Sequence, residues 1–239
     1  MSSMRPYMRR ALAAFALALA ALAWASCGGG GNGDGGLDPE VQALLEGMVL
    51  TEEDLPAGLV RANVAFSTNE DLAEAKGEPE VELEKLERQG RRLGIDVNFV
   101  PGQDAPPEFA LRGGVQATLS LYSTADGASE SFREGVEGVS QSDLAAGYPD
   151  LQDVEVEELD RKVGDESVWF RITGISAAGD LVIDDQVVFR VGSARSFLRA
   201  VSTFDADANA GRDAYLEEVA AMAEVAVSRI EQALASLGD

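Results

Sequence analysis

The chain has 239 residues, no histidine, one cysteine and a formal net charge of −23. The absence of histidine excludes Ser-His-Asp and Cys-His catalysis, histidine metal sites and a near-neutral imidazole switch. The acidic excess argues against nucleic acid as a partner, and a single cysteine cannot form an internal disulfide. A catalytic carboxylate pair or a Ser-Lys dyad needs no imidazole and stays open.

The first 26 residues have the organisation of a signal peptide. Arg5, Arg9 and Arg10 precede an apolar run over residues 11–22, which ends in small residues. A membrane-spanning helix needs about 20 apolar residues. Because this run is shorter, the pattern favours a cleavable export signal over a permanent anchor. We therefore predict a signal peptide over residues 1–26 and an extracytoplasmic location for the rest of the chain.

Two cleavage sites compete at the end of this signal. Ser26-Cys27 is similar to the lipobox of bacterial lipoproteins, in which the cysteine is acylated and becomes the mature N-terminus, although Trp24 stands where that pattern prefers an aliphatic residue. Cleavage after Ala25 also fits the small-x-small pattern of ordinary secretion. The lone cysteine precedes a glycine-rich segment, so we predict acylation of Cys27, with palmitate or a similar chain anchoring the protein in the bilayer.

Residues 27–36 are predicted to be a flexible tether, and residues 37–239 a single extracytoplasmic domain. The tether contains a G-x-G-x-x-G match, but no strand precedes it, so a dinucleotide site is rejected. Loss of the three signal-peptide arginines would leave 16 basic against 42 acidic side chains, a net charge of −26 in place of −23. This excess is interpreted as a solvated, self-repelling surface.

The domain is predicted to begin with a short helix and a strand. Asp38 suits an N-cap and Pro39 the first helical position, so a helix is predicted from Pro39 to about Val49. Apolar and polar residues then alternate, which predicts a half-buried strand. Its predicted buried face consists of Val60, Ala62, Val64 and Phe66.

A charged helical region and a loop are predicted next. The helical region runs from Asn69 to Gly94, restarts at Pro79 and closes with Gly94 as its C-cap. A short strand is predicted over residues 95–99, before an exposed loop over residues 102–114.

The second half of the domain is predicted to be rich in strands. Alternation predicts a strand over residues 115–122, followed by a helix to about residue 139. A turn at residues 147–149 precedes a short strand near residues 154–156. Residues 167–204 are predicted to form a three-strand antiparallel meander.

A final helix from Arg212 to about Leu237 is predicted to cover this sheet with an apolar face. That face consists of Leu216, Val219, Ala223, Ala226, Ile230 and Leu234. The element order predicts an α+β domain in which helices, including a long C-terminal helix, cover an antiparallel sheet.

Three turn motifs carry a resemblance to known proteins. Leu55-Pro56-Ala57-Gly58, Gly164-Asp165-Glu166-Ser167 and the segment 187–192 before a closing helix resemble extracytoplasmic lipoproteins of high-GC bacteria. A helix-covered antiparallel sheet also looks like Mog1/PsbP-type domains, which serve as accessory or binding modules. The resemblance implies an envelope location and no activity, because fold does not fix function.

Three groups of residues are candidate sites. Asp205, Asp207 and Asn209 offer oxygen ligands at alternate positions and form a calcium candidate, but the EF-hand glycine and glutamate are missing from their places. The favoured interpretation is a loop whose acids lie near a helix N-terminus. Tyr122, Trp169 and Arg171 fit either an anion- or sugar-binding face or ordinary packing, and packing is favoured. Asp165, Glu166 and Ser167 fit either a turn or a catalytic group, and a turn is favoured.

These observations predict a membrane-anchored lipoprotein that acts as a non-catalytic binding or accessory module of the cell envelope. Its expected partners are the lipid bilayer, through acylated Cys27, and an envelope protein or small ligand. No cofactor is expected apart from the calcium candidate. The alternative is a carboxylate-dependent hydrolase of envelope polymers, which would need two acids facing one cleft.

Overall fold

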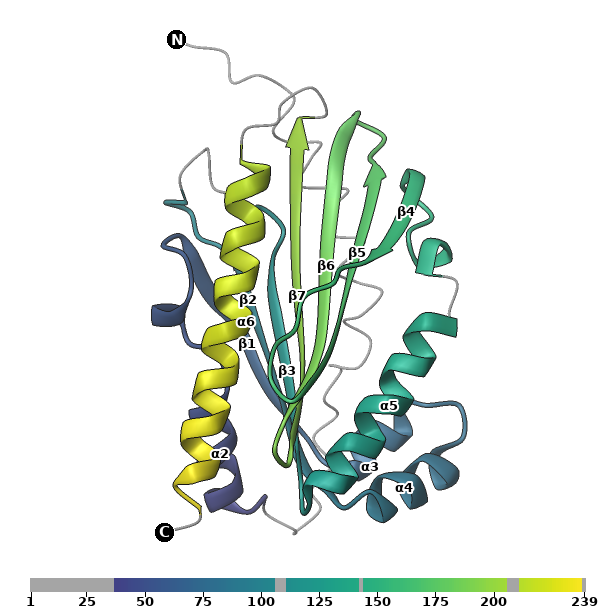
Figure 1. The fold of residues 1–239 in the computed structure, drawn as a ribbon, viewed down its shortest axis with the longest axis vertical. Helices are drawn as coiled ribbons and strands as arrows, with labels where there is room; N and C mark the ends of the chain where they lie inside the picture. Colours follow the sequence, from purple (N-terminus) through teal and green to yellow (C-terminus); the bar gives the residue numbers. More distant parts are fainter. Residues whose placement is uncertain (1–36, 106–110, 142–143, 206–210, 238–239) are drawn as a thin grey trace. The chain divides into compact units, whose positions relative to one another are not determined.

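The computed structural model describes residues 37–105, 111–141, 144–205 and 211–237. The signal peptide, Cys27 and the tether lie outside the described residues. The described chain forms a seven-stranded sheet in the order β1-β2-β3-β7-β6-β5-β4 (Figure 1). Each neighbouring pair of strands is antiparallel, which confirms the predicted α+β class. None of the described helices is long and apolar enough to span a membrane.

The strands and helices follow the predicted order closely. The strands are β1 (Leu59–Ser67), β2 (Arg91–Pro101), β3 (Gly114–Tyr122), β4 (Gln152–Glu158), β5 (Glu166–Ile175), β6 (Asp180–Val191) and β7 (Ala194–Asp205). The α-helices are α2 (Pro39–Met48), α3 (Asn69–Glu74), α4 (Pro79–Arg88), α5 (Ala125–Gln141) and α6 (Arg212–Ala235). Two 3-10 turns, η2 (Glu52–Asp54) and η3 (Leu144–Gly147), complete the described elements.

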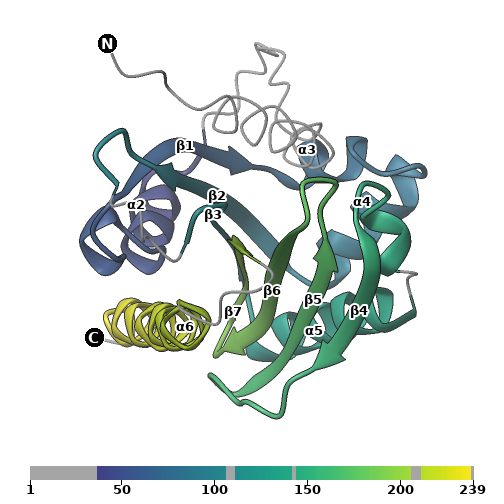
Figure 2. The same ribbon diagram turned by 90° about the horizontal axis from the view of Figure 1, so that it is seen from above.

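Helices α2 and α6 pack on one face of the sheet, and α5 covers the other with α3 and α4 beside it (Figure 2). The predicted apolar face of α6 is confirmed, because Val219, Ala223 and Ile230 are buried in the core. The sequence pattern missed Tyr215 on this helix. Tyr215 is fully buried, and its hydroxyl donates to the carbonyl oxygen of Ala200 at 2.8 Å, which fixes α6 against β7.

The predicted helix end at Gly94 is wrong. The chain turns at Gly90, whose φ of +70° suits glycine, and β2 begins at Arg91. Gly94 instead lies inside the strand, where an added Cβ would overlap the guanidinium of Arg91. That guanidinium is buried and donates to Ser67, Asn69 and Ser120. Burial lowers the pKa of Arg91 below its ordinary value.

The predicted buried face of β1 is correct at Val64 and Phe66 but wrong at Val60, because the strand contains a β-bulge between Arg61 and Asn63. Arg61 lies opposite Phe99, and Val64 lies opposite Val97, so both point to the side of the core although they are three residues apart. Val60 points to the opposite face. The side chains of Val60 and Val64 are 43% and 37% exposed.

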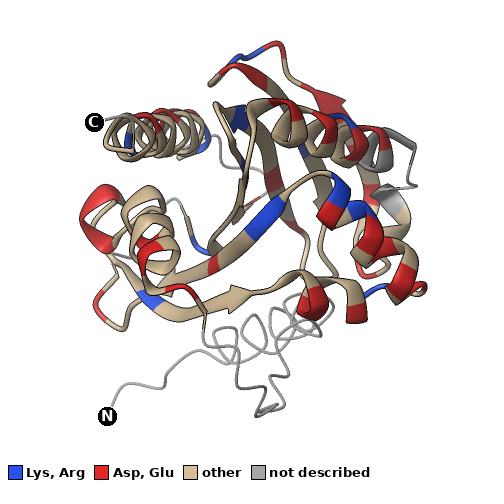
Figure 3. Ribbon diagram, turned by 90° about the horizontal axis from the view of Figure 1, so that it is seen from below, with Lys and Arg blue, Asp and Glu red and all other residues tan. Residues whose placement is uncertain are grey.

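Acidic residues are spread over most of the helices, and basic residues are fewer (Figure 3). Most arginines of the described domain form an ion pair with an acid of a helix, strand or loop. The Arg61 side chain has no such partner among the described residues, so it is informative about where a ligand could bind.

Candidate functional site

A pocket of about 570 Å³ lies between α2 and the strands β1 and β2. Its lining residues come from three segments: Glu46, Val49, Leu50 and Thr51 from α2 and the chain after it; Arg61, Ala62, Asn63 and Val64 from β1; and Ile95 and Val97 from β2. The volume lies within the ~300–1,000 Å³ typical of small-molecule sites.

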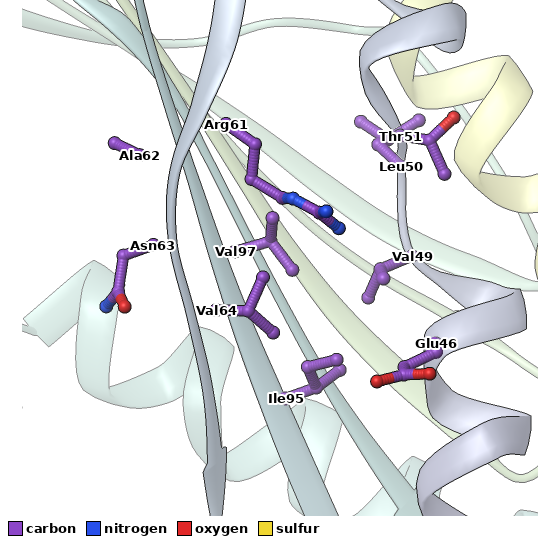
Figure 4. Close-up of a pocket in the computed structure, with 10 residues that line it drawn as sticks. All are labelled: Glu46, Val49, Leu50, Thr51, Arg61, Ala62, Asn63, Val64, Ile95 and Val97. Carbon is purple, nitrogen blue, oxygen red and sulfur yellow. The ribbon is translucent and has the colours of Figure 1, made fainter.

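Two charged side chains stand at opposite sides of an apolar floor (Figure 4). Val64, Ile95 and Val97 form this floor, and the guanidinium of Arg61 extends over it from β1. Glu46 approaches from α2. Within the described ranges, neither the Arg61 side chain nor that of Glu46 has a hydrogen-bond or ion-pair partner. Both charges are therefore available to a ligand.

The bulge in β1 creates this arrangement. In a regular strand, side chains three positions apart point to opposite faces. The extra residue, Ala62, turns Arg61 onto the same face as Val64, and re-aiming a side chain in this way is a common role of bulges near binding sites. Asn63, by contrast, points away from the pocket (Figure 4).

The chain around Thr51 is held in place by the carboxylates of Asp54 and Glu52. The Asp54 carboxylate accepts from the backbone N–H and the hydroxyl of Thr51, both at 2.8 Å, and from Arg229 of α6 at 2.9 Å. Glu52 accepts from the backbone N–H of Arg61 at 2.7 Å. The pocket wall is thus joined to α6 on one side and to β1 on the other.

The only adjacent pair of buried acids in the described chain lies elsewhere, on β6. Asp184 and Asp185 point to opposite faces of the sheet, because successive side chains of a strand alternate. Asp185 accepts from Arg171 at 2.8 and 3.0 Å and from the indole of Trp169 at 3.1 Å. Asp184 accepts from Arg199 at 2.9 and 3.0 Å.

Tyr148 also binds the carboxylate of Asp184. Its hydroxyl donates to Asp184 at 2.7 Å and accepts from Gln186 at 3.0 Å. Burial, together with the neighbouring charge of Asp184, raises the pKa of Tyr148 above its ordinary value of 10.0. These acids are bound to their own arginines, so they hold the sheet together and do not present a catalytic pair to a cleft.

The residues of the predicted aromatic face are not together. Trp169 and Arg171 of β5 lie on the same face of the sheet as Asp185 of β6, and Trp169 is 1% exposed. Tyr122 lies on the opposite face, where its hydroxyl is 2.6 Å from that of Ser131 in α5. The packing interpretation of these side chains is the one that the geometry supports.

The acids that precede β5 bind one arginine of β6. Arg190 donates to Asp165 at 2.9 Å and to Glu166 at 2.5 Å, and Asp165 also accepts from the backbone N–H of Gly192. The Arg190 and Ser129 hydrogen bonds hold the pKa of Glu166 below its ordinary value of 4.5. This arrangement fits the predicted turn into the meander.

The calcium candidate lies mostly outside the described residues. Asp205 is the last residue of β7 and is exposed, while Asp207 and Asn209 fall in the undescribed range 206–210. In the part of the chain that the structure does describe, no group of three or more Asp, Glu or Cys residues could hold a metal ion. The calcium site stays a prediction.

The sequence reasoning did not single out the pocket residues. Arg61 appeared only as a polar position in an alternating strand, and Glu46 only as part of an amphipathic helix. The sequence contains no signal for the bulge, and the segments that meet in the pocket are separated by up to about 50 residues in the chain. The two consecutive acids within an apolar strand, Asp184 and Asp185, were a signal that could have identified the buried ion pairs.

Comparisons with known proteins found similar solved structures but no family. No model of a known family matches the chain, and no curated protein matches it. The extracellular domain of PknH from Mycobacterium tuberculosis matches over 82% of this chain and 100% of that domain, with 11% sequence identity and a TM-score of 0.44. At this level of similarity, the match carries no inference about function.

Proposed function

We propose that this protein is a lipid-anchored binding module of the bacterial cell envelope. The N-terminal sequence supports export and anchoring, because an export signal is followed by a lone cysteine and a glycine-rich tether. In this proposal, acylated Cys27 holds the acidic domain at the outer face of the membrane. The domain then binds a small ligand in the pocket between α2 and β1.

The observation that carries the binding role is the pair of unpartnered charges over an apolar floor. Ligand sites typically combine an apolar surface with a few polar groups that fix orientation. Glu46 and Arg61 supply such groups, and Val64, which is 37% exposed, supplies apolar surface above the buried Ile95 and Val97. The alternative, a carboxylate hydrolase, has less support, since Glu46 is the one acid among the described lining residues.

The binding role is tested by filling the pocket. Val64→Trp places an indole over the floor, and Val60→Trp is the matched control, because Val60 is similarly exposed but lies on the opposite face of the same strand. Both proteins are incubated with an extract of the native envelope, repurified and examined by native mass spectrometry. We expect a bound small molecule on the wild type and on the Val60 variant, and a loss of at least about tenfold for Val64→Trp. Equal occupancy in both variants, or no adduct on the wild type, would contradict the proposal.

The anchor is tested separately. Cys27→Ser removes the acylation site, so the protein is expected to move from the membrane fraction to the soluble fraction. Mass spectrometry of the wild type is expected to show a mature N-terminus at Cys27 with added lipid mass. A mature N-terminus at Ser26 without lipid would support ordinary secretion instead.

A further inference from the structure

We propose that the face of the sheet opposite the pocket binds an uncharged glycan, which lies across strands β1, β2 and β3. This inference is independent of the pocket and adds a second binding surface to the proposed module. It follows from a row of side-chain amides that the strand register creates, from the way one carboxylate orients two of them, and from the neutralisation of the charges in and beside the row.

The register of the sheet places five planar polar side chains in one row. They occupy directly opposed positions on five neighbouring strands: Asn63 (β1), Asn98 (β2), Gln116 (β3), Arg199 (β7) and Gln186 (β6). Directly opposed residues of an antiparallel pair share a face, and neighbouring strands are about 4.8 Å apart. The row therefore crosses the strands and presents one polar group per strand.

The amide end of this row is accessible. Asn63 is exposed and points away from the pocket (Figure 4), and Asn98 and Gln116 are partly exposed. Helix α5 contacts the same face at the other end of β3, where the Tyr122 hydroxyl lies 2.6 Å from that of Ser131. A ligand can therefore reach the three amides without displacing α5.

The carboxylate of Asp96 orients the two central amides. It accepts from the side-chain nitrogens of Asn98 at 2.6 Å and Gln116 at 2.8 Å, and from the hydroxyl of Thr118 at 2.6 Å. With their N–H groups turned to Asp96, both amides have carbonyl oxygens that accept no hydrogen bond from the described residues. The ligand is thus expected to supply donors to these two oxygens.

The charges in and beside the row are already neutralised or hydrogen-bonded. Arg199, the charged member of the row, donates to Asp184 at 2.9 and 3.0 Å. The three hydrogen bonds to Asp96 occupy most of the four lone-pair sites of its carboxylate. The acidic domain attracts cations as a whole, but this attraction is screened beyond about 8 Å at physiological salt. The row itself therefore favours a ligand without charge.

A glycan supplies the complementary groups. A hydroxyl both donates and accepts, so it can donate to the oxygens of Asn98 and Gln116 and accept from the Asn63 amide. Val100 and Val201 are partly exposed on the same face, next to the row, and offer apolar contact to the C–H groups of a sugar ring. A peptide that extends a sheet runs along an edge strand and uses its backbone, whereas this row crosses the strands and offers side chains.

The test is isothermal titration calorimetry with three neutral glycans: cellopentaose, maltopentaose and tetra-N-acetylchitotetraose. The purified protein is expected to bind at least one of them at millimolar concentration or below. Because the ligand is uncharged, the affinity should change less than about twofold between about 50 and 500 mM salt. Asn63→Ala and Gln116→Ala should each weaken binding by about 2–10-fold, the effect of one net hydrogen bond, and the double variant should multiply the two losses.

Two control variants separate the row from the rest of the molecule. Gln152→Ala removes an exposed amide of β4 that lies outside the row, and Val64→Trp fills the pocket on the other face. Both should bind the glycan as the wild type does. The melting temperature of Asn63→Ala should equal that of the wild type, because the Asn63 side chain has no hydrogen-bond partner among the described residues.

Three results would overturn the inference. The first is that the wild type binds none of the three glycans, and the second is that Asn63→Ala and Gln116→Ala bind as tightly as the wild type. The third is tighter binding of spermidine or of the blocked peptide acetyl-(Gly-Ser)4-amide, which would assign the row to a cation or a peptide. If Val64→Trp abolished glycan binding and Asn63→Ala did not, the glycan would belong to the pocket, and only the proposed pocket function would stand.

Discussion

The charges on the central strands and the charges around the pocket are arranged in opposite ways. On β5, β6 and β7, Asp184 and Asp185 are each bound to an arginine in the interior of the protein. At the pocket, Glu46 and Arg61 are exposed and have no partner among the described residues. Desolvated charges are tolerated only when paired, whereas hydrated charges remain free to bind. The first set stabilises the fold, and the second set is open to a ligand.

Breaking a buried pair should have the largest effect. Asp185→Ala leaves the guanidinium of Arg171 and the indole N–H of Trp169 without their acceptor, at a site where the Asp185 side chain is 0% exposed. We expect the free energy of unfolding to fall by about 3–5 kcal/mol, measured by chemical denaturation. Asp185→Leu combined with Arg171→Met should recover most of this loss.

The control for this prediction is Glu130→Ala. It removes an exposed ion pair with Arg88 at 3.3 Å and should cost less than about 1 kcal/mol. If Asp185→Ala and Glu130→Ala lowered the free energy of unfolding equally, the buried and exposed ion pairs would contribute equally to stability, and the prediction would be wrong.

Substituting two glycines by alanine should change the free energy of unfolding in opposite directions, because their surroundings are packed differently. Gly127 of α5 lies against the backbone carbonyl of Gln89, and an added Cβ would overlap it. Gly127→Ala is therefore expected to lower the free energy of unfolding by about 1–3 kcal/mol. Gly47, next to the pocket in α2, has no atom within 4 Å of an added Cβ, so Gly47→Ala should stabilise the protein by about 0.5–1 kcal/mol. Thermal melts of both variants check the opposite signs.

The pH dependence of stability should show a smaller effect. The folded-state pKa of Glu166 is lowered by hydrogen bonds from Arg190 and Ser129, so its contribution to stability is present above the ordinary value of 4.5 and is lost as the pH falls through the lowered pKa. Glu166→Gln should lose less stability than the wild type on acidification below that value. Glu157→Gln, at an exposed position of β4, is the control, and denaturant midpoints measured across this pH range distinguish the two variants.

Removing the pocket charges should have the smallest effect on stability. Arg61→Gln and Glu46→Gln alter exposed side chains without partners in the described chain, so the free energy of unfolding is expected to change by less than about 0.5 kcal/mol. A loss as large as that of Asp185→Ala would show that these charges are structural and would contradict their assignment to a ligand.

The elements of the fold were predictable where local patterns were strong. Asp38 and Pro39 correctly predicted the start of α2, and alternation correctly predicted β3 and the meander. The prediction failed at Gly94, which lies in a strand because its missing side chain leaves room for Arg91. It also failed at Val60, which the bulge in β1 places on the face away from the core. Both errors arise from contacts between segments distant in the chain, which local periodicity does not report.

The sequence by itself determined the predicted export signal and the lipidation candidate, the acidic character, the exclusion of histidine chemistry, and the α+β class. These properties depend on composition and on short-range periodicity, which can be read along the chain. Only the tertiary structure decided which acids are neutralised and where the unpaired charges meet. Strand register and the bulge fix both outcomes, because they determine which distant side chains share a face of the sheet.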